Sequence, residues 1–157
     1  MADFVFNVAK GHVSEYATRV LGNDPANSAF IVVLLKASVA DATAKDYDTL
    51  GDVIGDASTD ECDATDYVRK TIDDTGEGLT RTVDDTNDRI DLDVSDITWT
   101  GLGGATNNTL SDLLFTYDSD TTAGTDANII PCTQHDFVLT TQNTDVTAQV
   151  TNFFRAS

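Results

Sequence analysis

The feature that most constrains the fold is an uninterrupted apolar run, AFIVVLL, at residues 29–35. It is far shorter than the roughly 20 apolar residues that a membrane-spanning helix needs. Its isoleucine and two valines are branched at Cβ, and such residues favour strands over helices. Apolar side chains occupy both the odd and the even positions of this run, which point to opposite faces of a strand. We therefore predict a strand that is buried on both faces.

The aspartate-rich stretch at residues 83–101 raises the question of whether its carboxylates form a site or the solvated face of a strand. In IDLDV, residues 90–94, apolar residues alternate with aspartates, which is the pattern of a half-buried strand. The apolar pattern continues at Ile97 and Trp99, but at odd-numbered instead of even-numbered positions. A slip of one residue would turn them away from the core, so we predict a β-bulge or a bend near Ser95–Asp96.

Further strands follow from the same reasoning, and the composition agrees with a β-rich chain. Aspartate supplies 24 of the 27 acidic residues, and there are 24 threonines. Aspartate favours turns and caps, whereas threonine suits strands. The other predicted strands lie at residues 67–72, 79–83, 109–117 and 128–131, and the linker QNT joins strands at 136–141 and 145–150 in a hairpin.

Helical spacing of apolar residues is found near the start of the chain. Ala9, Val13, Ala17 and Val20 lie on one stripe, which predicts a helix over residues 8–21 that stops at Gly22. A second, short helix is predicted around residues 50–54. We therefore expect a mainly β protein: a β-sandwich or barrel-like domain of seven to eight short strands, with one N-terminal α-helix packed on it. Residues 1–157 are expected to form a single domain.

The charge restricts the partners that the protein can bind. A net charge of −18 at neutral pH repels phosphates, so we expect neither nucleic acid nor an anionic membrane as a direct partner. The N-terminal residues lack the basic and apolar regions of a secretory signal, so we expect synthesis in the cytoplasm. The two cysteines, Cys62 and Cys132, leave one disulfide open as an alternative to two free thiols.

Candidate catalytic and metal sites are weak. The turn at residues 84–88 begins like an EF-hand calcium loop, but the required glycine and glutamate are replaced by Arg89 and Ser95. The aspartates at residues 118–126 are either a calcium loop of another kind or ordinary turn residues. Cys132 and His135 offer too few ligands for zinc. We expect no enzymatic activity, no catalytic or metal site and no cofactor, and we interpret Asp91 and Asp93 as a solvated strand face.

The aromatic residues are the better candidates for function. Trp99, Phe153 and Phe154 either pack in the core or anchor a protein interface. Adjacent strand residues point to opposite faces, so one of the two phenylalanines is expected to point outward. Together with Arg155, it would form an interface anchor near the end of the chain. The predicted interface residues are therefore Trp99, Phe153, Phe154 and Arg155.

Several strings, among them NDPANSAFIVV, KDYDTLGDVI and SDLLFTYDSDTTAGTDANIIP, resemble small proteins encoded among the structural genes of tailed bacteriophages. The resemblance runs over nearly the whole chain, from DDTNDRIDLDVSDITWT in its middle to the ending FFRAS. It implies a virion component that is assembled in the host cytoplasm. It assigns no catalytic role to any residue.

Among virion components we favour a capsid decoration, or cement, protein. Such a protein would bind the major capsid protein on the outside of the head shell, where an acidic surface meets basic patches and avoids the packaged DNA. We expect a homo-oligomer, with a trimer favoured by the three-fold positions of capsids. The alternatives are a head–tail connector, tail or fibre-tip component, and a carbohydrate-binding module that recognises the host surface.

Overall fold

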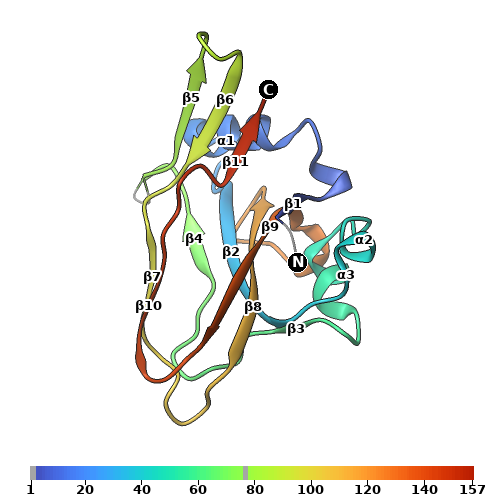
Figure 1. The fold of residues 1–157 in the computed structure, drawn as a ribbon. Helices are drawn as coiled ribbons and strands as arrows, with labels where there is room; N and C mark the ends of the chain where they lie inside the picture. Colours follow the sequence, from blue (N-terminus) through green and yellow to red (C-terminus); the bar gives the residue numbers. More distant parts are fainter. Residues whose placement is uncertain (1–2, 76–77) are drawn as a thin grey trace.

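The computed structural model describes residues 3–75 and 78–157 and shows a mainly β protein, as predicted (Figure 1). Its eleven described strands form a β-sandwich-like fold with one long N-terminal helix, more strands than the seven to eight expected. No helix within the described residues is long and apolar enough to cross a membrane.

The main sheet is antiparallel and has β2, residues Ala29–Ala37, at its centre. Its strand order is β1-β9-β8-β2-β3, and β4 pairs with β2 beside β3. The other bounds are Phe4–Val5 for β1, Asp60–Glu61 for β3, Lys70–Ile72 for β4, Thr109–Asp118 for β8 and Ile130–Thr140 for β9. The first seven residues of β2 are all buried, which confirms the strand predicted to be buried on both faces.

The second layer is a narrow antiparallel ribbon. β7, Ile97–Leu102, pairs with β10, Thr144–Ala148. Beyond it, β6, Arg89–Asp93, lies between β5, Thr80–Asp84, and β11, Phe154–Ala156.

A break in the ribbon confirms the bend predicted near Ser95–Asp96. The strand β6 ends at Asp93 and β7 begins at Ile97, and Leu92 and Trp99 are both buried although they stand at opposite parities. The three residues between the two strands restore the inward direction of the apolar side chains.

Helices cover both sides of the main sheet. α1, Val13–Gly22, packs with the ribbon side, and the short α2, Asp41–Ala44, and α3, Leu50–Gly55, cover the other face (Figure 1). The predicted helix start at residue 8 is wrong, because a 3-10 turn, Asn7–Ala9, precedes Gly11, whose φ of +82° interrupts the helix. The predicted short helix is α3, and it begins with a capping box between Thr49 and Asp52.

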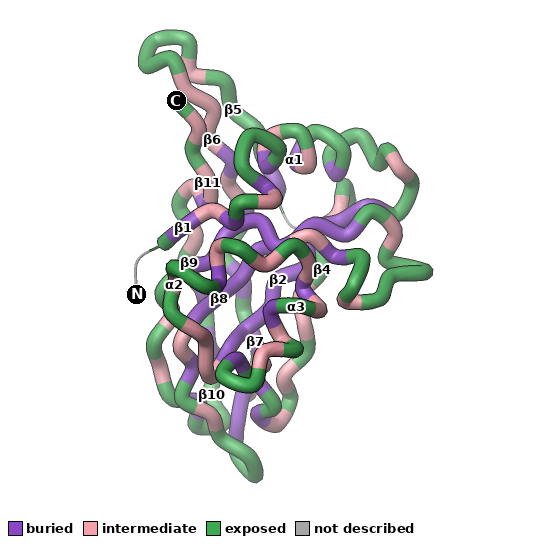
Figure 2. Tube along the Cα trace, turned by 90° about the vertical axis from the view of Figure 1, so that its right-hand side faces the viewer, coloured by how far each residue is buried: buried purple, intermediate pink, exposed green. Residues whose placement is uncertain are grey.

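The strict alternation of β2 divides the core in two. Phe30, Val32 and Leu34 belong to the cluster between the sheet and the ribbon. The residues between them, Ile31, Val33 and Leu35, belong to the cluster beneath α2 and α3, so the buried strand runs between two apolar layers (Figure 2). Each such side chain contributes about 1.5–3 kcal/mol by leaving water.

Two predicted strands and the predicted hairpin differ from the structure. The strand expected at residues 67–72 is shorter, since β4 covers only Lys70–Ile72. The strand expected to end at Pro131 continues as β9, because the proline lies at a register shift opposite residues 115–116, where a ladder hydrogen bond is dispensable. The predicted hairpin is also wrong: β9 pairs with β8 and β1, whereas β10 pairs with β7.

Candidate binding groove

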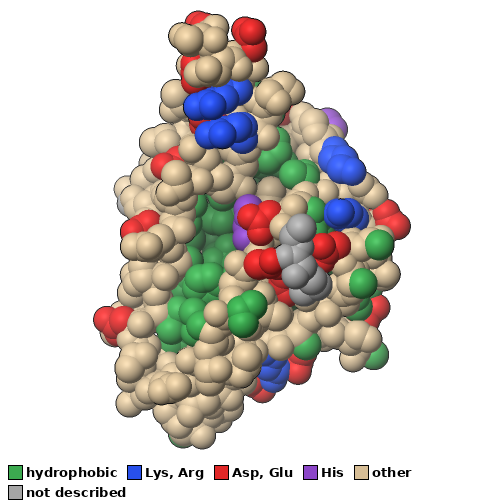
Figure 3. Space-filling view, in the orientation of Figure 1, with side chains coloured by type: hydrophobic (Ala, Val, Ile, Leu, Met, Phe, Trp, Pro, Cys, Tyr) green, Lys and Arg blue, Asp and Glu red, His purple; other side chains and the backbone are tan. Residues whose placement is uncertain are grey.

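The two strands of the predicted hairpin splay apart, and a groove lies between them (Figure 3). Its main compartment has a volume of about 260 Å³. It is bounded by β9 on one side and by residues 148–153, which follow along the ribbon, on the other. We call this feature the β9–β10 groove.

Hydrogen bonds in the three-residue connection explain why the hairpin opens. The amide of Thr141 donates to the carbonyl of Asn108, at 2.8 Å, next to the start of β8. The amide of Asn143 donates instead to the carbonyl of Leu102, at 2.9 Å, at the end of β7. The connection is thus attached to two different sheets, which directs β9 and β10 into separate layers.

The floor of the β9–β10 groove is apolar. Leu113 and Phe115 of β8 line it together with Phe137 of β9, and Ala148 and Val150 line its other wall. Leu113 and Phe115 are almost fully buried, at 3% and 1% exposure, whereas Phe137 is half-buried; Figure 3 shows hydrophobic side chains in the hollow between the layers. The result is a hollow with a partly exposed apolar lining, and exposed apolar surface often marks an interaction site.

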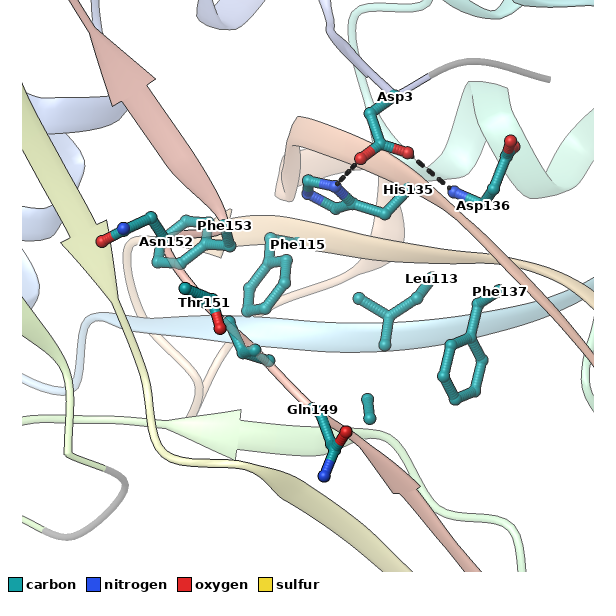
Figure 4. A pocket seen from close by; sticks show the side chains of 12 residues that line it. Asp3, Leu113, Phe115, His135, Asp136, Phe137, Gln149, Thr151, Asn152 and Phe153 are labelled. Carbon is teal, nitrogen blue, oxygen red and sulfur yellow. Dashed lines mark hydrogen bonds and ion pairs between the residues drawn. The ribbon is translucent and has the colours of Figure 1, made fainter.

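A polar cluster stands at the rim of the groove, where the N-terminal segment meets β9 (Figure 4). The Asp3 carboxylate lies 3.1 Å from Nδ1 of His135 and accepts a hydrogen bond of 3.0 Å from the amide of Asp136. Partial burial opposes ionisation of Asp3, but the hydrogen bonds from Asp136 and His135 outweigh it, so the pKa of the Asp3 carboxyl is lowered. The cluster therefore attaches the N-terminal segment to the edge of β9.

The cluster has the connectivity of a catalytic triad but not its accessibility. Nε2 of His135 lies 2.9 Å from the hydroxyl of Thr133, and Nδ1 faces Asp3. Because an ionised Asp3 can only accept, Nδ1 donates to it, and in neutral imidazole Nε2 accepts from Thr133. Thr133 is only 1% exposed, so its hydroxyl serves to orient His135, whose ring stands edge-on to Phe115 at 5.9 Å.

Cys132 and His135, weighed as a zinc pair, offer too few ligands. Cys132 is fully buried, and this burial raises the pKa of its thiol well above the ordinary value. A thiol in such surroundings is a poor nucleophile at neutral pH. Cys62 is also buried, and the two cysteines are free thiols, so of the two alternatives the structure has no disulfide.

Two of the four predicted interface residues, Trp99 and Phe153, lie in the core of the chain, which was the alternative to an interface anchor. Trp99 is 1% exposed, and its indole N–H donates to the carbonyl of Val68 at 2.9 Å. Phe153 is 5% exposed and stacks on Phe115 with ring centroids 4.2 Å apart. At the rim of the groove, this stack closes one end of the apolar floor.

The other two lie on β11 and are more accessible. Phe154 is half-buried and packs partly against the core, while Arg155 is exposed. Of the two adjacent phenylalanines, Phe153 is buried and Phe154 is the more exposed, although an extra residue in this segment interrupts the strand alternation before β11. Phe154 lies six residues after Ala148, whereas their pairing partners, Leu92 on β6 and Ile97 on β7, are only five residues apart.

The interpretation of Asp91 as a solvated face is also corrected. Its side chain is 12% exposed, and its carboxylate accepts hydrogen bonds from Arg89, at 3.0 Å, and from Arg155. Asp93 is half-buried and accepts from the amide of Asn152 at 3.0 Å. These aspartates therefore hold the C-terminal segment on β6.

Two of the aspartates weighed as calcium ligands, Asp84 and Asp126, have other partners. Asp84 accepts from the turn residues Thr86 and Asn87, as an Asx turn does, and Asp126 pairs with Arg69 across the chain. Within the described residues, no group of three or more His, Cys, Asp or Glu side chains is placed to hold a metal ion.

Comparison of the chain with protein-family models, curated proteins and solved structures finds no match. The virion resemblance thus stays a prediction. The site itself was missed by sequence reasoning, because the contact between Asp3 and His135 joins residues 132 positions apart. No local pattern in either segment indicates that the other lies beside it.

Proposed function

We propose that this protein is a virion structural protein of a tailed bacteriophage, and that it decorates the outside of the capsid by binding the shell through the β9–β10 groove. The observation that carries the proposal is the groove itself, an apolar floor between an edge of β9 and residues 148–153 on a strongly acidic chain. The resemblance of its sequence strings to phage structural proteins supplies the virion context.

The physical features of the groove suit binding to another protein. Protein interfaces combine an apolar, aromatic centre with a polar rim. Here Phe115, Phe137 and Phe153 contribute to the lining, and Asp3 and His135 stand at the rim. A charge of −18 favours a basic partner surface and disfavours packaged DNA, which agrees with a position outside the shell.

The first test is the copy number in purified particles, measured by quantitative mass spectrometry. A decoration protein should be present in numbers comparable with those of the major capsid protein. A copy number equal to a single ring would indicate a head–tail connector or tail component instead. Absence from the particle would refute the virion assignment.

The second test compares particles with and without the protein. A ligand that binds only the assembled shell adds RT ln(1 + [L]/Kd), about 2.7 kcal/mol at a hundredfold excess over Kd. Particles that lack the protein should still assemble but release DNA at a lower temperature or after milder osmotic shock. Equal resistance of the two particle types would contradict a cement role.

A further inference from the structure

The β9–β10 groove lies between an edge of β9 and the segment that follows β10, residues 148–153, of which only Ala148 belongs to the strand. Beyond Gln134, where the pairing with β1 ends, the described strands offer β9 only β8 as a neighbour. β10 has only β7 as a neighbour among the strands that the structure describes. Unpaired edges of this kind are templates for an additional strand.

The backbone along the ribbon wall supports strand pairing. The amides of Val150 and Asn152 point toward the ribbon, where they donate to the carboxylates of Asp96 and Asp93, each at 3.0 Å. Gln149 directly follows β10, before the chain bends at Thr151 and Asn152 takes a φ of +54°, so its amide should point to the side opposite that of Val150, away from the ribbon. No hydrogen bond in the described part of the chain uses that amide.

From these features we propose that the β9–β10 groove binds an extended segment of another protein as an added β-strand, with apolar and basic residues alternating along that segment. The apolar side chains would cover the half-buried Phe137, and the backbone would pair with the open edge of β9 and with the amide of Gln149. This inference rests on geometry and charge, and it stands whether or not the protein belongs to a virion.

The charge of the chain selects the occupant. With a net charge of −18 and the carboxylates of Asp3 and Asp136 in the groove lining, the potential around the groove favours lysine and arginine. A second copy of the chain would bring the same negative charge to the site. A basic segment of a different protein is therefore the better occupant than a strand of a second copy.

The test uses the purified full-length protein and a short capped peptide in which valine and lysine alternate. Binding is followed by calorimetry and by amide chemical shifts of β9 and Gln149. Phe137→Ser should weaken binding at least about tenfold, as for a residue at the centre of an interface. The matched control is Val138→Ser, because Val138 is the next residue along β9 but is 78% exposed and outside the groove lining.

Two altered peptides separate charge from strand pairing. Replacing each lysine by glutamate should abolish binding if the acidic surroundings select the occupant. Methylating alternate backbone nitrogens should abolish binding if the peptide pairs as a strand. Equal binding of either altered peptide would overturn the corresponding part of the inference.

Other outcomes would overturn the inference as a whole. One is that the basic peptide does not bind, and another is that Phe137→Ser and Val138→Ser weaken peptide binding equally. A third is that the groove binds an oligosaccharide instead of the peptide, and a fourth is that the protein forms a dimer that Phe137→Ser dissociates. Peptide binding that fails while particles carry many copies of the protein would leave the decoration proposal in place and refute only the added strand.

Discussion

Replacement of Phe153 by alanine should lower the free energy of unfolding by about 3 kcal/mol. Its ring is 5% exposed, stacks on Phe115 at 4.2 Å and meets Phe30 edge-on at 5.5 Å. Substitution of a core phenylalanine by alanine costs about 3–5 kcal/mol. Phe153 borders the β9–β10 groove, so the vacated space would open to water rather than form a closed cavity, which places the expected cost at the lower end.

The neighbouring residue provides the control. Phe154 is half-buried, so Phe154→Ala should cost only about 1–2 kcal/mol. Both variants can be measured by urea unfolding, with the fluorescence of Trp99, the sole tryptophan, as the probe. Truncation after Thr151 removes both phenylalanines and β11, so it should destabilise more than either substitution. If Phe154→Ala proved as costly as Phe153→Ala, the packing described for this segment would be refuted.

Three further predictions concern charged and titrating groups. Asp91→Asn should lower the free energy of unfolding by about 1–2 kcal/mol because it weakens charged hydrogen bonds to two arginines. In the same denaturation assay, Asp85→Asn at an exposed position should change that free energy by no more than about 0.5 kcal/mol. Because the pKa of Asp3 is lowered by folding, its ionised carboxylate stabilises the protein fully above pH 3.8, and this stabilisation is lost as the pH falls through the folded-state pKa. Thermal melts should therefore show that the higher melting temperature of the wild type over Asp3→Asn disappears in acid. A difference in melting temperature that stays constant with pH would contradict this. All four tyrosines have raised pKa values, that of Tyr47 to about 12 because its hydroxyl donates to Asp56, and the others mainly through burial. An absorbance titration should therefore find the phenols of the folded protein ionising above the ordinary value of about 10. The stability that the neutral phenols provide is complete below that pH and should fall as the pH rises through the raised values.

Features that depend on short-range patterns were predictable from the sequence. The apolar run at residues 29–35 identified β2, because a strand with apolar side chains at both parities has to be buried on both faces. The parity change between Leu92 and Ile97 likewise located the break between β6 and β7. The short helix α3 was predictable too, and its start is stabilised by the local capping box at Thr49.

Predictions failed where a distant segment supplies the partner. Asp91 alternates like a solvated residue, but Arg155 arrives from 64 positions away and partly covers it. Phe153 is predictable as one of two phenylalanines on opposite faces, but the extra residue in its own segment, residues 148–154, and the stacking of its ring on Phe115 are not. Neither partner can be identified from the local pattern.

The β9–β10 groove most clearly separates a predictable feature, two strands, from an unpredictable one, their pairing. From the sequence alone, two alternating segments joined by a short polar linker determine two strands, and a hairpin is the usual way to pair them. Only the tertiary structure decides that the linker bonds to Asn108 on one side and to Leu102 on the other, so that each strand finds its partner in a different layer. The alternation of a strand specifies which side chains are buried but not which edge pairs with which, because every edge offers the same backbone donors and acceptors.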